Sequence, residues 1–375
     1  MGKLLVITND FPPRIGGIQN FLYELLKGFD PEQVIVFCSF WRKSREFDLA
    51  QNYKIIRVRS SVLLPTKKRA KQAIEIAKTH NCDRVLFGAS APLGLMAPNL
   101  KRAGIKKIAA LTHGHEAGWS GFFILRQILK RIYKHLDVVT YLGEYSRKRL
   151  APLMPASVEF VRLTPGVDTN LFHPRVKKDK EELLAKYGLS DKQVIFCVSR
   201  LMPRKGQDQL IEIWPKLLQR NPKAHLVLSG GGPYRRTLSR KVKTKNLQDH
   251  VTFLGRLTQA ELARHYGMSE IFAMPNRTRN FGLDVEGLGM VYLEAAACGL
   301  PTIGGRAGGV PDALIEESSG YLIKPKSKKE LVSRLDFLLQ NPQVAYSMGE
   351  AGRDWIVLNW QWAMRREQLK QLLEV

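Results

Sequence analysis

The stretch LLVITNDFPPRIGGIQNFLYELL, residues 4–26, decides the fold class of this 375-residue chain. Residues 4–8 form a largely apolar run, which is typical of a strand covered on both faces of a parallel sheet. A loop with two prolines and Gly16-Gly17 follows, and then comes the apolar spacing of an amphipathic helix. A buried strand, a glycine turn and a helix together make one unit of a doubly wound α/β domain.

This alternation continues along the chain in two series, which predicts two parallel sheets with helices packed on them. The first series of expected strands covers residues 4–8, 34–39, 54–59, 84–88, 107–112, 138–142 and 159–163. The second series covers residues 194–199, 225–229, 251–254, 271–274, 301–303 and 320–323. Helical patterns in the first series cover residues 17–28, 67–80, 92–103, 122–136 and 144–152.

A break between the two series marks the expected domain boundary. Pro165-Gly166, Phe172-His173-Pro174 and a charged run over 175–182 are typical of a linker. We therefore expect an α/β protein with two Rossmann-like doubly wound domains facing a deep cleft, where ligands of such sheets bind. The expected parts are a first domain over 1–170, a linker over 171–190, a second domain over 191–355, and a C-terminal helix over 356–375 that returns to the first domain.

The charge of the chain points to an anionic partner. Fifty-nine Lys and Arg residues against 34 Asp and Glu residues give a net charge of +25. Nucleic acid, an anionic membrane surface and a phosphorylated substrate all fit such a balance. No helix-turn-helix, zinc-finger or RNP-like aromatic motif is present, which disfavours nucleic acid. No run approaches the roughly 18 apolar residues of a membrane span, and the N-terminus lacks the features of a signal peptide.

Candidate ligand-binding residues follow two of the expected strands. Arg200, Arg204 and Lys205 fall within six residues after the strand at 194–199, where cations suit a diphosphate. A solvated basic loop is the alternative. Gly16-Gly17 would let an anion approach a helix N-terminus, although an ordinary strand–helix turn explains the pair as well. The four cysteines are widely spaced, which predicts reduced thiols and not a disulfide or zinc site.

The most specific stretch is NRTRNFGLDVEGLGMVYLE, residues 276–294. Glu286 lies among glycines in an expected loop, and Glu294 lies about two turns into the helix that follows. Both carboxylates could face one pocket and accept hydrogen bonds from the hydroxyls of a sugar. The turn Gly308-Gly309-Val310-Pro311 completes the pattern.

With these motifs in place, the chain resembles the retaining family-four glycosyltransferases of GT-B fold. Among them it is most similar to the GDP-mannose-dependent phosphatidylinositol-monomannoside α-mannosyltransferases. The matching segments are residues 8–19, 112–116, 165–168, 199–208, 253–257, 272–295 and 308–312. The resemblance implies transfer of mannose from GDP-mannose to a membrane lipid acceptor. The alternatives are another nucleotide sugar used to build a polysaccharide or lipopolysaccharide core, and a basic nucleic-acid-binding protein without catalysis.

The resemblance also assigns roles in the second domain. Arg200 and Lys205 match the pair that binds the donor diphosphate and stabilises the leaving nucleotide. Glu286 matches the acid at the transferred sugar, and Glu294 matches the acid at the ribose. Residues 256–257, Arg256 and Leu257, lie where the family binds the nucleobase. Fixed cations can neutralise a leaving group in place of a metal. Because no Asp-x-Asp motif ends a strand, we expect no metal and no other cofactor.

In the first domain, Gly16 and Gly17 match the glycine loop that approaches the diphosphate, and His113 matches the histidine beside the donor sugar. The expected catalytic residues are therefore His113, Arg200, Lys205 and Glu286. His113 and His115 in THGHE are not expected to form a metal pair, on the expectation that their side chains point to opposite faces of a strand. Asn280-Phe281 departs from the small residues usual in these relatives. The lysine content of the chain is also higher than we expect of these relatives.

Residues 122–150 carry seven Lys and Arg residues and two acids. Phe122, Leu125, Leu129, Ile132 and Leu136 follow helical spacing. This basic amphipathic pattern suits an anionic membrane surface, and it equally suits a helix whose apolar stripe packs on the sheet. We expect a cytoplasmic protein, peripheral at the inner face of the cell membrane, whose oligomeric state the sequence leaves open.

Overall fold

Two parallel sheets organise the computed structural model of the protein, which describes residues 2–374. The chain divides into one unit made of Met1–Gly166 with Trp362–Val375, and a second unit made of Val167–Gln361. All thirteen strands expected from the apolar runs overlap a strand of the structure. The predicted fold class, two Rossmann-like α/β domains, is confirmed.

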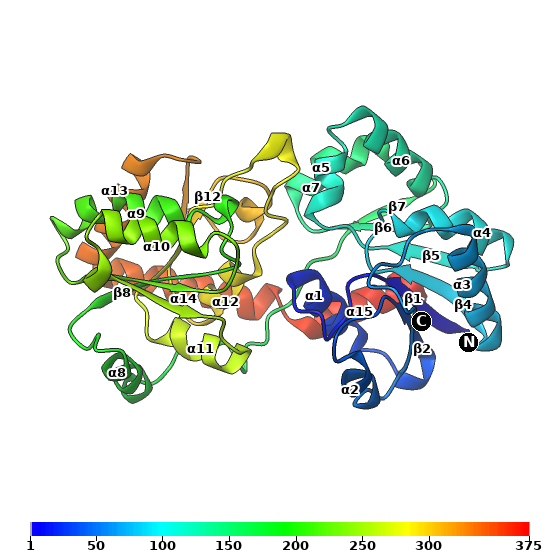
Figure 1. Ribbon diagram of the computed structural model, residues 1–375, viewed down its shortest axis with the longest axis horizontal. Helices are drawn as coiled ribbons and strands as arrows, with labels where there is room; N and C mark the ends of the chain where they lie inside the picture. The colour runs from blue at the N-terminus through cyan, green and yellow to red at the C-terminus, as the bar shows by residue number, and fades with distance from the viewer. Residues whose placement is uncertain (1, 375) are drawn as a thin grey trace. The chain divides into compact units, whose positions relative to one another are not determined.

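The sheet of the first unit has the order β3-β2-β1-β4-β5-β6-β7, with every neighbouring pair parallel. Its strands are β1 (Lys3–Thr8), β2 (Val34–Cys38), β3 (Lys54–Arg57), β4 (Cys82–Phe87), β5 (Lys107–Ala110), β6 (Val138–Tyr141) and β7 (Glu159–Arg162). Its α-helices are α1 (Gly17–Leu26), α2 (Ser44–Leu49), α3 (Lys67–Thr79), α4 (Ala97–Arg102), α5 (Gly114–Trp119), α6 (Phe123–Tyr133), α7 (Glu144–Leu150) and α15 (Trp362–Leu373). Figure 1 shows helices on both faces of this sheet.

The sheet of the second unit has the order β10-β9-β8-β11-β12-β13 and is also parallel. Its strands are β8 (Gln193–Val198), β9 (Ala224–Ser229), β10 (Val251–Gly255), β11 (Ile271–Met274), β12 (Thr302–Gly305) and β13 (Gly320–Ile323). Its α-helices are α8 (Lys177–Lys186), α9 (Gln207–Leu218), α10 (Arg235–Thr244), α11 (Gln259–Gly267), α12 (Met290–Ala297), α13 (Lys328–Gln340) and α14 (Pro342–Asn359).

The last helix of the chain belongs to the first unit. Arg366 of α15 donates from Nε to the Glu24 carbonyl of α1 at 2.8 Å, and its guanidinium forms an ion pair with the Glu24 carboxylate. The Trp362 ring lies 6.2 Å from the Phe21 ring of α1. The change of unit occurs between residues 361 and 362, and not at 356, because α14 extends to Asn359.

The stretch 171–190, expected as a linker, contains a helix. α8 buries Leu183 and Leu184, and Lys180 forms an ion pair with Glu270 at 2.9 Å. The change of unit occurs earlier, between Gly166 and Val167. A charged run resembled a linker because only two residues of this helix are apolar and buried.

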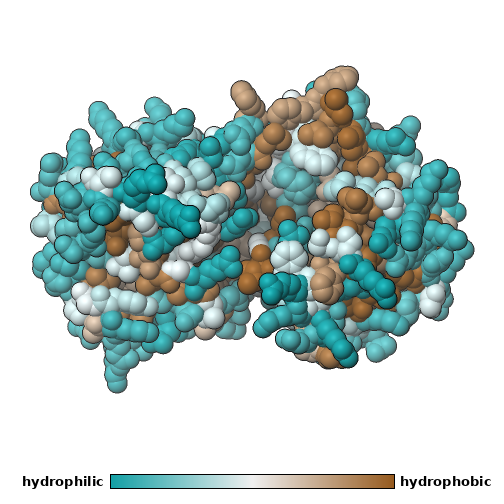
Figure 2. All heavy atoms as spheres, viewed as in Figure 1, coloured by the Kyte–Doolittle hydropathy of each residue, from teal (hydrophilic) through white to brown (hydrophobic). Residues whose placement is uncertain are grey.

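Helix α6 settles part of the question left open for residues 122–150. Leu129, Ile132 and Leu136 are buried in the hydrophobic core, so most of the predicted apolar stripe packs on the sheet. Phe123 and Ile124 at the start of α6 are exposed instead. Apolar side chains gather over the α5–α6 segment in Figure 2. No helix within residues 2–374 is both long enough and apolar enough to span a membrane.

Candidate active site

The loop that follows β8 carries three cations on a tight turn. The 3₁₀ turn Pro203–Lys205 leads into Gly206, whose φ of 82° lies in the left-handed region. A Cβ on Gly206 would collide with the carbonyl oxygen of Pro275, which follows β11. Only glycine lets these two segments approach so closely. The cations therefore lie against the segment that carries the acidic residues.

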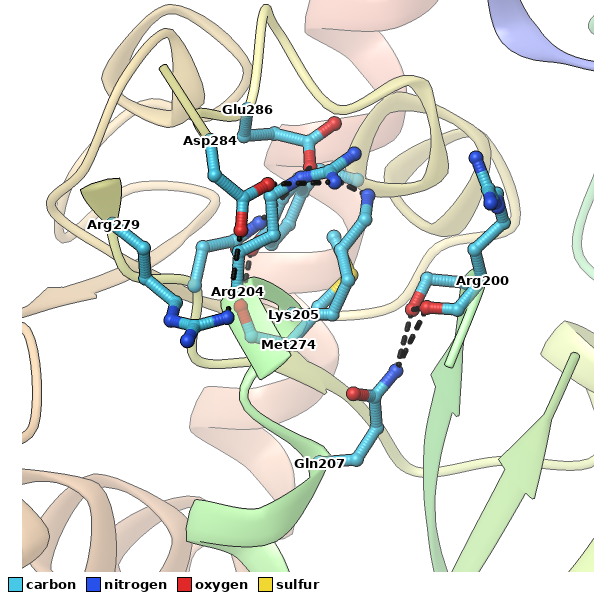
Figure 3. A network of polar contacts seen from close by, with 11 residues as sticks. Arg200, Arg204, Lys205, Gln207, Met274, Arg279, Asp284 and Glu286 are labelled. Atoms are coloured by element: carbon cyan, nitrogen blue, oxygen red, sulfur yellow. Dashed lines mark hydrogen bonds and ion pairs between the residues drawn. The ribbon is translucent and has the colours of Figure 1, made fainter. Parts of the chain in front are cut away.

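Lys205 and Glu286 form an ion pair inside the second unit. Lys205 Nζ lies 2.5 Å from Glu286 Oε2, and both side chains are largely buried. Arg204 forms an ion pair with Asp284 at 3.0 Å, and its Nε lies 3.7 Å from Glu286 Oε2. Arg279 completes the cluster at 3.6 Å from Asp284. Figure 3 shows these side chains pointing toward one another.

The backbone around Glu286 is held by the Gly308-Gly309 turn. Gly309 donates its N–H to the Glu286 carbonyl at 2.9 Å. A Cβ on Gly308 would collide with that carbonyl oxygen, and a Cβ on Gly309 would collide with the carbonyl of Gly287. Asn276 Nδ2 also donates to Glu286 Oε2 at 3.4 Å. The glycine pair predicted as a turn is thus needed for close backbone packing under the acid.

Electrostatics keep Glu286 ionised. Burial by itself raises the pKa of this carboxyl, but the cations Lys205 and Arg204 outweigh burial and lower the pKa below its ordinary value. A carboxylate that is ionised at neutral pH accepts hydrogen bonds from hydroxyl groups. Glu286 can therefore bind a polyol while it remains paired with Lys205.

Arg200 lies outside this cluster. Its side chain is exposed, and within the described part of the chain its guanidinium makes no ion pair or hydrogen bond. Its backbone is held by Gln207, whose Nε2 donates to Ser199 Oγ at 2.7 Å and to the Arg200 carbonyl at 3.4 Å. Figure 3 shows the guanidinium directed away from Lys205. Arg200 and Lys205 were predicted to act as a pair. Lys205 is already neutralised by Glu286, whereas the Arg200 guanidinium is available to bind a ligand.

Glu294 occupies a different environment on α12. The helix begins after Gly289, which has a φ of 92°, and Glu294 is 9% exposed. Tyr266 donates from its hydroxyl to Glu294 Oε2 at 3.1 Å. Burial raises the pKa of Glu294 to about 7, because no cation compensates for the loss of solvent. The two acids of the motif therefore have pKa values displaced in opposite directions.

Arg256 and Leu257 follow β10 beside the glycine loop after β9. A Cβ on Gly231 would lie 2.9 Å from Arg256 Nε, and Gly230 has a φ of 122°. The Gly230-Gly231-Gly232 loop thus leaves room for the Arg256 side chain, which is exposed. These residues lie on the same unit as Lys205 and Glu286.

The first unit packs His113 against the helix that follows the glycine turn. The His113 ring packs edge-to-face on Phe21 of α1 at 6.0 Å. Helix α1 starts at Gly17, where an added Cβ would meet nothing within 4 Å. The open space at Gly17 fits the expected close approach of a ligand, although nothing in the backbone angles of this turn demands glycine.

His113 is a buried, neutral imidazole. Its Nε2 lies 2.8 Å from the Gly88 carbonyl, which only accepts, so Nε2 carries the proton. Its backbone N–H donates to Glu116 Oε2 at 2.8 Å. Burial lowers the pKa of His113, against the opposing influence of Glu116.

The expectation that His113 and His115 point to opposite faces of a strand was wrong, because residues two apart in a strand share one face and because neither residue lies in a strand. β5 ends at Ala110, His113 caps α5, and His115 lies within that helix. The two rings lie 6.2 Å apart and are nearly parallel. Sequence reasoning also missed Asp284, Arg279 and Tyr266. Their only signal was proximity in sequence to the glutamates or to a strand end.

Comparison with known proteins places these motifs in a wider group. The family model "Glycosyltransferase Family 4" matches residues 15–171, and "Glycosyl transferases group 1" matches residues 179–355. The chain is 41% identical to a GDP-mannose-dependent alpha-(1-6)-phosphatidylinositol monomannoside mannosyltransferase of Mycolicibacterium smegmatis, over 99% of this chain and 98% of that protein. It is 42% identical to a GDP-mannose-dependent monoacylated alpha-(1-6)-phosphatidylinositol monomannoside mannosyltransferase of Corynebacterium glutamicum, with the same coverage.

Solved structures share the fold at much lower identity. HepE of Anabaena in complex with UDP has a TM-score of 0.84 at 16% identity and covers 99% of each chain. Sucrose-phosphate synthase of Thermosynechococcus elongatus has a TM-score of 0.80 at 20% identity, covering 99% of this chain and 98% of that one.

Proposed function

Because the chain belongs to the family-four glycosyltransferases of GT-B fold, we propose that it transfers mannose from GDP-mannose to a membrane lipid such as phosphatidylinositol monomannoside. The observation that carries the proposal is 41–42% identity, over nearly full length, to enzymes named for this donor and acceptor. The residues of the second unit supply the chemistry that such a reaction requires.

The donor diphosphate is held by Lys205 and Arg200. Charge accumulates on the leaving GDP as the glycosidic bond to mannose breaks, and fixed cations stabilise that charge in the transition state. Among residues 2–374 the Arg200 guanidinium has no partner to give up, and Lys205 is held in place by Glu286. Glu286 contacts hydroxyls of the mannose. Transfer proceeds with retention of configuration, so that an α-linked donor gives an α-linked product.

The nucleoside is held by Glu294 and by residues 256–257. Glu294 accepts hydrogen bonds from the ribose hydroxyls, and Arg256 and Leu257 contact the base. In the first unit, His113 lies beside the sugar as a neutral hydrogen-bond donor or acceptor. Gly16-Gly17 lets the diphosphate approach the backbone closely.

No metal takes part in the proposed mechanism. The support is positional: cations at the end of β8 already occupy the place where a leaving diphosphate needs positive charge. The test is activity in EDTA after extensive dialysis. Full activity is expected, and complete loss that Mg²⁺ or Mn²⁺ restores would contradict the proposal.

The protein works at the inner face of the cell membrane as a peripheral enzyme. Helix α6 presents Arg126, Lys130, Arg131 and Lys134 as exposed cations, beside exposed Phe123 and Ile124. Such a combination favours an anionic lipid surface.

The decisive experiment for the activity is product analysis. The purified enzyme is incubated with a panel of radiolabelled nucleotide sugars and a total lipid extract that contains phosphatidylinositol mannosides. We expect label from GDP-mannose, and from no UDP-sugar, in a chloroform-soluble product cleaved by an α-mannosidase. Label from a UDP-sugar, or label only in a water-soluble polysaccharide, would overturn the assignment. The Glu286→Gln variant is the matched inactive control.

A further inference from the structure

The internal contacts of the Glu286 side chain all reach one of its two carboxylate oxygens. Oε2 lies 2.5 Å from Lys205 Nζ and 3.7 Å from Arg204 Nε. Asn276 Nδ2 donates to the same oxygen at 3.4 Å. Among residues 2–374, no hydrogen bond or ion pair reaches Oε1. The side chain thus has one occupied oxygen and one open oxygen, and whatever fixes Oε2 decides where Oε1 points.

The three groups around Oε2 differ in how strictly they orient the carboxylate. The ammonium of Lys205 is a compact charge with rotatable donors, so it attracts a carboxylate from many directions. Arg204 is engaged with Asp284 at 3.0 Å, and its Nε lies beyond hydrogen-bond distance of Oε2 (Figure 3). Asn276 has a planar amide, which donates along fixed N–H directions. In the described part of the chain, the long bond from Asn276 is therefore the directional contact to Oε2.

The amide of Asn276 is itself held in one orientation. Asn276 is 1% exposed, so its polar atoms depend on partners within the protein. Tyr292 shares its hydroxyl proton between Asn276 Oδ1 and the Met274 carbonyl. If the amide were rotated by half a turn, Oδ1 would face the Glu286 carboxylate, where two acceptors repel each other. The hydroxyl on one side and the carboxylate on the other therefore both direct Nδ2 toward Glu286.

Tyr292 is fixed in the core of the second unit. It lies on α12, is fully buried, and packs its ring edge-to-face on Phe272 of β11 at 5.3 Å. A Cβ on Gly289 would lie 2.7 Å from this ring, and a Cβ on Gly304 would lie 3.2 Å from it, so both glycines make room for the ring. Burial raises the pKa of Tyr292 well above its ordinary value. The hydroxyl therefore keeps its proton and remains a donor.

We propose that Asn276 and Tyr292 are positioning residues for Glu286: Tyr292 orients the amide of Asn276, and the amide holds Oε2 so that Oε1 faces the bound sugar. The role of Glu286 at the sugar rests on the proposed function. Neither Asn276 nor Tyr292 touches the substrate. Without the amide, Glu286 stays paired with Lys205, but its carboxylate rotates about the last side-chain bond. Turnover then falls, because fewer molecules present Oε1 to the sugar hydroxyls.

A chemically equivalent relay at the other edge of the same sheet supplies a matched control. Asn221 is 3% exposed, and its Nδ2 donates to Asp336 Oδ1 at 2.9 Å. Its Oδ1 accepts from Gln340 Nε2 at 2.9 Å. Asn221 precedes β9 at the amino ends of the parallel strands, whereas Asn276 follows β11 at their carboxyl ends. Asn221→Ala therefore removes the same kind of contact far from Glu286.

The first experiment separates positioning from a general loss of structure. Turnover of GDP-mannose and calorimetric binding of GDP, which lacks the sugar, are measured for Asn276→Ala, Tyr292→Phe and Asn221→Ala. We expect kcat to fall about tenfold or more in Asn276→Ala and about threefold to tenfold in Tyr292→Phe, with GDP affinity within about twofold of wild type. Asn221→Ala should match the wild type in both measurements. Unchanged kcat in Asn276→Ala, or an equal loss of kcat and GDP affinity, would overturn the proposal.

An isosteric variant keeps this test decisive if the alanine variant does not fold. Asn276→Asp retains the shape of the side chain but replaces the Nδ2 donor with an acceptor that faces Glu286 Oε2. Its kcat should fall about tenfold or more, again with GDP binding retained. Wild-type turnover in Asn276→Asp would contradict the orienting role of the amide.

The second experiment asks whether the two residues act in series. If Tyr292 acts on Glu286 only through Asn276, Tyr292→Phe should not lower kcat further once Asn276 has been replaced. The double variant Asn276→Ala with Tyr292→Phe should then have a kcat within about twofold of Asn276→Ala alone. Losses of thermal stability are expected to add, because Tyr292 also donates to the Met274 carbonyl. Losses of kcat that multiply would show independent action and would refute the relay.

The same variants distinguish failure of this proposal from failure of the proposed reaction. If the wild type turns over another nucleotide sugar and not GDP-mannose, the reaction assignment fails. The comparison is then made with that donor and its nucleoside diphosphate, and a loss of kcat with retained diphosphate binding supports the relay. If GDP-mannose is the donor and Asn276→Ala and Asn276→Asp both turn over as the wild type does, the reaction stands and the relay is wrong.

Discussion

Lys205 Nζ lies 2.5 Å from Oε2 of Glu286, so the two residues proposed to hold the donor phosphate and the donor sugar neutralise each other. The pair keeps an ammonium and a carboxylate side by side in a largely buried position. Burial disfavours an isolated charge, so the pairing offsets a cost that either group alone would bear. The site thus holds its charges ready before a substrate arrives.

This pairing predicts different consequences for two cations of the same site. Lys205→Ala should lower turnover about 30- to 1000-fold and should also destabilise the fold by about 2 kcal/mol, because it leaves Glu286 buried with a weaker partner. Arg200→Ala should lower turnover comparably and leave stability unchanged, because the exposed Arg200 guanidinium has no partner among the described residues. Steady-state kinetics and urea unfolding measure the two effects. Equal stability of the two variants would contradict the structural role of the ion pair.

Glu294 predicts a pH dependence of donor binding. Burial raises its pKa to about 7. The carboxylate that accepts hydrogen bonds from the ribose hydroxyls therefore becomes protonated as the pH falls through 7. GDP-mannose affinity should therefore weaken below pH 7, by up to about tenfold per pH unit. Calorimetric titration with GDP-mannose is suitable, because both phosphates of this donor are esterified and do not titrate in the range.

The same raised pKa fixes the sign of the stability change. The folded protein retains the Glu294 proton between pH 4.5 and about 7, where the unfolded chain has released it. The free energy of unfolding should therefore fall as the pH rises through this window. Glu294→Gln should abolish both pH effects. Glu286→Gln should keep them and lower turnover, since the pKa of Glu286 is already below its ordinary value. Loss of both effects in Glu286→Gln would reverse the assignment.

The turn that carries Phe281, closed by an antiparallel bridge between Arg279 and Asp284, predicts a stabilising substitution. Phe281 has a φ of 54° and is 95% exposed, so it bears the cost of a left-handed backbone with almost no burial in return. Phe281→Gly should raise the free energy of unfolding by roughly 0.5–1 kcal/mol. Leu283→Gly in the same turn is the control, because Leu283 has an ordinary φ of −72° and glycine there should destabilise. Thermal unfolding of both variants checks the prediction.

The basic face of α6 predicts salt-sensitive membrane binding. Lys130, Arg131 and Lys134 are exposed, so their exchange for Gln should leave the fold intact. At about 1 kcal/mol for each cation, the loss is ~3 kcal/mol, or on the order of 100-fold in partitioning onto anionic vesicles. The effect should shrink at high salt, where the Debye length falls below about 8 Å. Exchange of the exposed Lys216, Lys243 and Lys245 of the second unit for Gln is the charge-matched control. If both triple variants bound alike, α6 would be a core helix only.

Much of the fold followed from local patterns in the sequence. Buried parallel strands favour apolar runs, and each of the thirteen expected strands overlaps a strand of the structure. The family predicted from the ordered motifs is confirmed by relatives of 41–42% identity over nearly the whole chain. Short helices were less visible. α2 and α5 have six residues each, and α5 contains Gly114 and Gly118, which lower helix propensity.

The candidate site was predicted as a set of residues but not as an arrangement. Nothing in the sequence distinguishes Lys205, which pairs with Glu286, from Arg200, which pairs with nothing in the described chain. That difference depends on Gly206 and on the Gly308-Gly309 turn, which bring distant backbone segments into contact. The opposite pKa shifts of Glu286 and Glu294 arise in the same way, because burial and neighbouring cations are properties of the folded chain.

The return of α15 to the first unit has a consequence for the order of folding during translation. The last strands of the first sheet leave the ribosome long before residues 362–373 do, and the whole second unit is synthesised in between. Until then the nascent first unit lacks the Trp362 ring beside Phe21 and the Arg366 contacts with Glu24. The backbone carbonyl of Leu373 that accepts from Arg84 Nε at 2.8 Å is also missing. The unit that begins the chain is therefore completed last, and the second unit must be synthesised before α15 can join the first unit.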